Sequence, residues 1–62
     1  MTTYTFHCLD NEGVSTTFHI EEAQNDEAAK ALTSSLFRIW PHCFEIEVSH
    51  GEGAAFRVAR PT

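Results

Sequence analysis

Histidine and cysteine are the residue types in this chain best suited to metal chemistry, because they supply the nitrogen and sulfur ligands that zinc prefers. They form two similar dipeptides, His7-Cys8 and His42-Cys43, and His19 and His50 are further candidates. Neighbouring residues of a strand point to opposite faces of a sheet, so neither dipeptide offers both ligands to one ion. His7 and His19 could meet diagonally across a hairpin, which is the one metal hypothesis that the spacing leaves. We expect no bound metal and no cofactor.

The short motifs that mark catalytic sites are missing from the sequence. It contains no Gly-x-Ser-x-Gly, no phosphate-cradling glycine loop and no His-Glu-x-x-His, and Ser34 and Ser35 read as helix-surface residues. A single helix on a small sheet also leaves little concavity for a pocket of about 300 Å³. We therefore expect that the protein is not an enzyme.

Size and charge limit the remaining functions. With 62 residues, 42% hydrophobic and 21% charged, the chain has the composition of one small folded domain spanning residues 1–62. Its net charge of −5 disfavours direct binding to nucleic acid and favours a protein partner with a basic surface. No apolar run reaches the roughly 18 residues of a membrane span, and the N-terminus lacks an export signal. These features predict a cytoplasmic protein without membrane contact.

The N-terminal third predicts a β-hairpin, because residues 3–10 and 14–20 place apolar side chains at every second position. Aligning these positions pairs Phe6 with Phe18 and leaves residues 11–13 as a three-residue loop. Gly13 falls where a type I turn followed by a bulge needs positive φ, which glycine accepts without strain. The positions predicted to be buried are Tyr4, Phe6 and Cys8 on the first strand and Val14, Thr16, Phe18 and Ile20 on the second.

The C-terminal third predicts a second hairpin of the same design. Val48 falls opposite Phe56 and Ile46 opposite Val58, which leaves residues 51–53 as the loop and Gly53 at the bulge position. The positions predicted to be buried are Phe44, Ile46, Val48, Ala54, Phe56 and Val58.

One amphipathic helix over residues 28–40 is expected between the hairpins. Asn25 can cap its start, and Pro41 ends it because the residue before a proline leaves the helical region. Asp26 and Glu27 in the first turn and Arg38 in the last turn match the helix dipole. The core stripe at helical spacing is Ala29, Leu32, Leu36, Ile39 and Trp40.

These elements predict an α+β fold of order ββαββ, with a four-stranded antiparallel sheet and one helix packed on one face. The helix returns the chain so that the second and third strands run parallel, most simply with the first strand between them, in the sheet order 2-1-3-4. The order 1-2-4-3 is also compatible with the pattern.

Strand parity assigns the remaining side chains to the face that the helix leaves open. It places Cys8 and Cys43 on opposite faces, so both are expected to be reduced thiols. It brings His7 next to Glu45, and Glu47 opposite Arg57. Side chains off the core that could support self-association are Phe37, Leu9, Ala55 and Ala59.

The acidic side chains are the candidate partner-binding residues. Strand direction gathers the acids at the helix start and at the second hairpin tip at one end of the domain. Glu45 and Glu47 lie about 6.5 to 7 Å apart on one side of a strand and could make a two-point contact. The full set is Glu21, Glu22, Asp26, Glu27, Glu45, Glu47 and Glu52.

The stretch from Tyr4 to His7, the helix and the final hairpin over residues 45–53 together resemble small bacterial and phage ββαββ domains. In length, acidity and lack of catalytic residues, the whole chain also looks like phage-encoded inhibitors such as anti-CRISPR proteins. This resemblance implies that a folded acidic surface occupies a basic groove of a partner or blocks a subunit contact.

Two function hypotheses follow from these observations. The first is a non-catalytic protein-binding inhibitor that uses the acidic residues named above. The second is a self-associating structural domain of a bacterial protein, for which a homodimer would form through the sheet edges or through Phe37 and Leu9.

Overall fold

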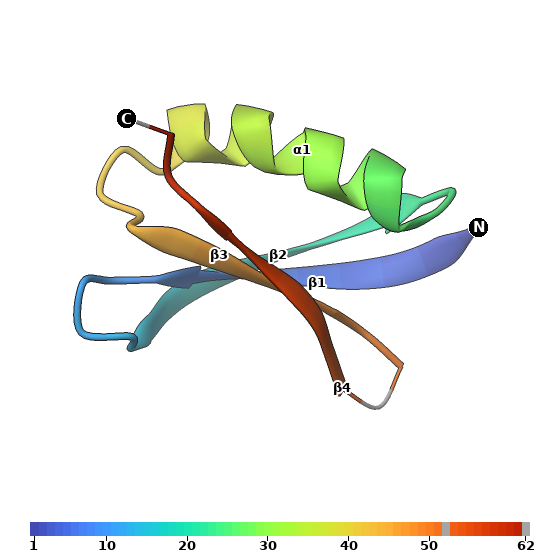
Figure 1. Cartoon of the computed structure of the whole chain (residues 1–62), viewed down its shortest axis with the longest axis horizontal. Helices are drawn as coiled ribbons and strands as arrows, with labels where there is room; N and C mark the ends of the chain where they lie inside the picture. Colours follow the sequence, from blue (N-terminus) through green and yellow to red (C-terminus); the bar gives the residue numbers. More distant parts are fainter. Residues whose placement is uncertain (52, 62) are drawn as a thin grey trace.

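The computed structural model describes residues 1–51 and 53–61, with the backbone alone for residues 54 and 55. It confirms the ββαββ fold, in which one helix lies along one face of a four-stranded antiparallel sheet of order β2-β1-β3-β4 (Figure 1). The elements are β1 (Thr2–Leu9), β2 (Ser15–Ala23), α1 (Asp26–Ile39), β3 (Glu45–His50) and β4 (Gly53–Ala59). Within the described residues, no helix is long and apolar enough to cross a membrane.

The first hairpin has the predicted loop and a different register beyond it. The amide of Asp10 donates to the carbonyl of Val14 at 3.0 Å, and Gly13 has a φ of 80° as expected. Oδ1 of Asp10 accepts from the amides of Glu12 and Val14 at 2.8 and 2.9 Å, which fixes the loop from inside. Two residues of β2, Ser15 and Thr16, then occupy the space opposite Leu9, because Leu9 pairs with Ser15 and Cys8 pairs with Thr17.

This β-bulge overturns the predicted pairing of Phe6 with Phe18. One extra residue in a strand moves every later side chain to the other face. Phe6 therefore pairs with His19, while Phe18 pairs with His7 on the open face. The prediction that the even-numbered residues of β2 are buried is wrong: Phe18 is 60% exposed and Ile20 is 55% exposed.

The second hairpin confirms the predicted pairs Val48–Phe56 and Ile46–Val58. Its tip differs, because the register shifts after Val48 and His50 pairs with Gly53. The positive φ therefore belongs to Gly51, at 61°, and not to Gly53 as predicted. A two-residue hairpin loop needs positive φ at its first position, which explains why Gly51 and not Gly53 has the positive φ. The predicted loop residue Glu52 and the side chains of Ala54 and Ala55 lie outside the described part of the structure.

The helix start and stop follow the sequence signals. Oδ1 of Asn25 accepts the amide of Ala28 at 2.9 Å, and Asn25 itself is extended, as an N-cap residue should be. The helix ends at Ile39, two residues before Pro41. The amide of Trp40 still bonds the carbonyl of Leu36 at 2.8 Å, which completes the last turn.

The buried stripe of α1 is rotated relative to the prediction. Its buried residues are Ala29, Thr33, Leu36 and Phe37. Phe37 is only 5% exposed and belongs to the core, whereas Ile39 is 68% exposed, so both predictions were wrong. Thr33 can occupy the stripe because its hydroxyl donates to the carbonyl of Lys30 at 2.6 Å and leaves no polar group unsatisfied.

The core forms between α1 and the two central strands. Phe6 of β1 and Ile46 and Val48 of β3 are fully buried. Leu9 is also buried, at 4% exposed, although its parity places it on the open face. The prediction that Leu9 could support self-association is therefore wrong. Phe44 was predicted to be buried and is 57% exposed, because β3 begins one residue after it.

Arg60 ties the C-terminal segment to the end of α1. Its Nε donates to the carbonyl of Cys43 at 2.6 Å, and its Nη2 donates to the carbonyls of Phe37, at 3.1 Å, and Trp40. The guanidinium lies 5.0 Å from the centroid of the Phe37 ring. One cation thus satisfies carbonyls that the helix end leaves free.

Candidate interaction surfaces

The end of the domain at which α1 begins is acidic, as predicted. Glu21 and Glu22 lie at the end of β2, and Asp26 and Glu27 follow in the first turn of α1 (Figure 1). We call these four residues the acidic end. The tip of the second hairpin reaches the same end, since His50 Nε2 lies 3.7 Å from Asp26 Oδ1. The predicted member Glu52 lies outside the described residues.

Asp26 is held in place by the core. The phenol of Tyr4, a residue 2% exposed, donates a 2.6 Å hydrogen bond to Asp26 Oδ1. This hydrogen bond, burial and the negative charge of Asp26 raise the pKa of Tyr4 to about 12. The ring of His50 packs edge-on against Tyr4, with centroids 5.1 Å apart.

Within the residues that the structure describes, the four carboxylates of the acidic end are not paired with lysine or arginine side chains. Glu21 contacts His19 Nε2 at 2.8 Å, and Asp26 contacts His50, but a histidine adds positive charge only when it is protonated. Lys30 and Arg57 line a shallow hollow beside Asp26 and Glu27 without forming an ion pair with them, so this end presents a mainly negative field to an approaching partner.

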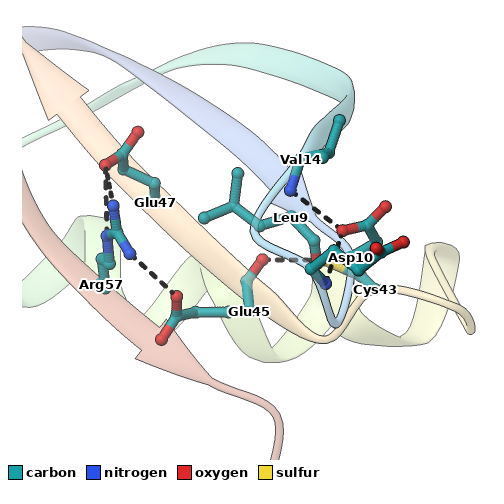
Figure 2. A network of polar contacts seen from close by, with 8 residues as sticks. Leu9, Asp10, Val14, Cys43, Glu45, Glu47 and Arg57 are labelled. Atoms are coloured by element: carbon teal, nitrogen blue, oxygen red, sulfur yellow. Dashed lines mark hydrogen bonds and ion pairs between the residues drawn. The ribbon is translucent and has the colours of Figure 1, made fainter.

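Glu45 and Glu47 are arranged differently, although they do share one side of β3. Arg57 lies between them on the open face (Figure 2), with Nη1 3.4 Å from Glu45 Oε1 and Nη2 3.1 Å from Glu47 Oε2. Glu47 pairs directly with Arg57 in the sheet, as predicted, but His7 pairs with Glu47 and not with Glu45. One guanidinium offsets much of the charge of the two carboxylates, which weakens them as a separate anionic contact.

The predicted contact residues thus form two groups. Glu21, Glu22, Asp26 and Glu27 share the end at which α1 starts, whereas Glu45 and Glu47 lie on the open face of the sheet. Strand parity and strand direction predicted both groups, but nothing in the sequence indicated that Arg57 reaches both Glu45 and Glu47.

The histidines do not come together as a metal site. Because of the bulge in β2, His7 lies on the open face and His19 on the helix side, so these two residues do not meet diagonally as the metal hypothesis would require. Among the described residues, no three histidine, cysteine or acidic side chains are placed to hold an ion.

The two cysteines lie next to each other, contrary to the prediction of opposite faces. Cys43 precedes β3, in the loop after Pro41, so strand parity does not govern its direction. Its thiol donates to the carbonyl of Glu45 at 3.2 Å. Burial and the adjacent Cys8 thiol raise the pKa of Cys43 to about 12, so this thiol stays protonated and is a weak nucleophile at neutral pH.

Both cysteines line an open groove of about 330 Å³ between the bulge of β2 and the end of α1. Ile39, Trp40 and His42 form the rest of its helix side. The expectation that so small a domain would lack a hollow of about 300 Å³ was therefore wrong. The groove is mainly apolar, and the Cys43 thiol that lines it stays protonated at neutral pH.

The exposed apolar residues of β2 are the feature that sequence reasoning missed. Phe18 and Ile20 were assigned to the core, and the bulge at Ser15 and Thr16 places them on the open face of an edge strand. The ring of Phe18 lies 6.2 Å from that of His7 and is otherwise largely open to solvent. A strand whose apolar side chains face water at the edge of a sheet is a surface suited to association.

Comparison with known proteins adds no relative to this description: no family model, curated protein or solved structure matches the chain.

Proposed function

We propose that this protein is a non-catalytic protein-binding module that acts in the cytoplasm as an inhibitor. Its acidic end covers a basic surface of a partner protein, either a groove that holds nucleic acid or a contact between subunits. Anti-CRISPR proteins, which this chain resembles in size and acidity, illustrate this type of action.

The observation that carries the proposal is the contrast between the two groups of acids. The carboxylates of Glu45 and Glu47 share Arg57, whereas those of Glu22 and Glu27 have no lysine or arginine partner within the described residues. Unpaired carboxylates on a rigid scaffold attract a basic surface and raise the rate of association. The rigidity comes from the Asn25 cap and from the bond between Tyr4 and Asp26.

The test is a pull-down from lysate at roughly 0.05 M and 0.5 M salt, with the bound proteins identified by mass spectrometry. We expect a partner with a basic surface that is retained at low salt and lost at high salt. A partner whose binding does not respond to salt would contradict the proposed mechanism.

Matched charge variants locate the contact. Glu27→Lys and Glu12→Lys change the net charge equally, but Glu27 belongs to the acidic end and Glu12 to the first hairpin loop at the opposite end (Figure 1). We expect Glu27→Lys to slow association about tenfold or more and Glu12→Lys to have a much smaller effect. Equal effects of the two variants would show that only net charge matters and would refute a contact at the acidic end.

A further inference from the structure

β2 is an edge strand whose protection against pairing lies near its two ends, in the bulge at Ser15 and Thr16 and in Glu21 and Glu22. It has nine residues and pairs on one side with β1, and in the sheet of the described residues its other side is free. Lysine, arginine and proline, which block many natural edges, do not occur between Ser15 and Ala23. Phe18 and Ile20 are more than half exposed on its open-face side. The free backbone groups and these side chains would be covered by one further strand.

A second copy of β2 can supply that strand. When a strand pairs antiparallel with its own copy, the symmetry axis must lie between the two copies of one residue. This is because directly opposed residues must both point their backbone N–H and C=O groups toward the partner strand or both point them away from it. The bulge at Ser15 and Thr16 interrupts the straight edge, which leaves residues 17–23 of β2 for pairing. Within this segment, a register centred on His19 pairs residues 17–21 of the two copies.

The register centred on His19 fits the side chains. It places Phe18 of each copy opposite Ile20 of the other, so two apolar pairs form on the open face. It also places Glu21 opposite Thr17, so the acidic half of the strand meets its hydroxyl-bearing half and like charges are not opposed. A register centred on Ile20 would instead place Phe18 opposite Glu22, and one centred on Phe18 would run into the bulge at Thr16.

The helix side of β2 offers a second contact in this arrangement. A groove of about 290 Å³ runs between β2 and α1 and is lined by His19, Leu32, Leu36, Ile39 and Trp40. The symmetry axis is perpendicular to the sheet, so both helices lie on the same face and flank it. Ile39 is 68% exposed and belongs to the lining of this groove, so it is available for contact with the second copy.

We propose that the protein forms a symmetric homodimer in which two β2 strands pair antiparallel over residues 17–21, with His19 at the axis, to make one continuous eight-stranded sheet from two four-stranded ones. The occupant of the edge is a second copy of this chain, because the strand complements itself in both apolar pattern and charge. This inference does not depend on the proposed function.

Sedimentation equilibrium over a concentration series tests the assembly. We expect a monomer–dimer equilibrium that Ile20→Lys weakens by about thirtyfold or more, because it places a cation against Phe18 of the other copy. Val14→Lys is the matched control, since Val14 is 56% exposed but lies before the paired segment, and it should leave the equilibrium unchanged. A wild-type protein that stays monomeric at every concentration, or equal weakening by both variants, would overturn the proposal.

Disulfide trapping tests the register. His19→Cys places two thiols directly opposite each other, so mild oxidation should yield a covalent dimer on a non-reducing gel. Glu21→Cys is the control, because the two Glu21 positions are four residues apart along the strands, or about 13 Å, and should not cross-link. Both are compared with wild type, in which Cys8 and Cys43 are buried. Efficient cross-linking at position 21 would refute this register, and a monomer that instead captures an extended peptide would refute the homodimer.

Discussion

The phenol of Tyr4 lies 2.6 Å from Oδ1 of Asp26 and ties the central strand β1 to the first turn of α1. The two residues are 22 positions apart, so the bond joins the sheet to the helix across the core. The same bond, with burial and the charge of Asp26, raises the pKa of Tyr4 to about 12 from an ordinary value of 10.0. It thereby couples one residue of the acidic end to the fold itself.

Titration of the phenol is the first prediction. Tyr4 is the one tyrosine of the chain, so the change in near-ultraviolet absorbance when a phenol ionises reports this site alone, above a constant contribution from Trp40. We expect half-ionisation near pH 12 in the folded protein and near pH 10 after denaturation. Because the pKa is raised on folding, the stability from this group is complete below pH 10 and is lost as the pH rises toward 12.

Asp26→Asn provides the control for this titration. It keeps a possible acceptor for the Tyr4 hydroxyl and removes the negative charge that opposes ionisation, so the pKa should move back toward 10. A Tyr4 pKa near 10 in the folded wild-type protein, or no response to Asp26→Asn, would show that the bond is not formed in solution.

Gly13 tests the backbone geometry of the first loop. Its φ is 80°, and a Cβ built there would meet nothing within 4 Å, so the cost of Gly13→Ala comes from backbone conformation and not from a clash. We expect a loss of about 1 kcal/mol in the free energy of unfolding, measured by urea denaturation. Gly53→Ala is the matched control, with equal free space and no positive φ, and should change stability by less than about 0.5 kcal/mol. Similar losses at the two positions would contradict this assignment of strain.

The sequence predicted the features that depend on local chemistry. The Asn25 cap, the helix stop before Pro41 and the positive φ of Gly13 each follow from a few neighbouring residues, and all three are confirmed. The favoured sheet order 2-1-3-4, in which the first strand lies between the second and the third, is also confirmed, whereas the alternative order 1-2-4-3 is not found.

The features that the sequence could not predict depend on contacts between distant segments. A bulge adds one residue to a strand without changing the alternation of apolar and polar residues in the sequence. Nothing in residues 14–20 therefore indicates that Ser15 and Thr16 both lie opposite Leu9. Likewise, Phe37 packs in the core and lies under the guanidinium of Arg60, which is 23 residues away. The acidic end was predictable because strand direction alone places its members, whereas the exposed edge of β2 was not.

Because of the bulge, substitutions at Ile46 and Ile20 should differ in their cost to stability. Ile46 is fully buried in β3, whereas Ile20 is 55% exposed, although the sequence pattern assigned both to the core. Ile46→Val should lower the free energy of unfolding by about 1 kcal/mol, and Ile20→Val by much less, when both are measured in dilute monomeric protein. Equal losses in the free energy of unfolding would indicate that β2 has the unbulged register, in which Ile20 faces the helix.

Arg60 provides the last prediction, because geometry and not charge alone explains its role. Its planar guanidinium donates to three carbonyls, those of Phe37, Trp40 and Cys43, and lies over the Phe37 ring. A lysine keeps the charge but cannot hold this fork or stack on the ring, so Arg60→Lys should cost about 2 kcal/mol in urea denaturation. Arg38→Lys, at an exposed position in the last turn of α1, keeps the favourable interaction with the helix dipole and should be nearly neutral. If the two substitutions proved equally mild, the carbonyls at the end of α1 would be satisfied by solvent, and Arg60 would not hold the C-terminal segment against the helix.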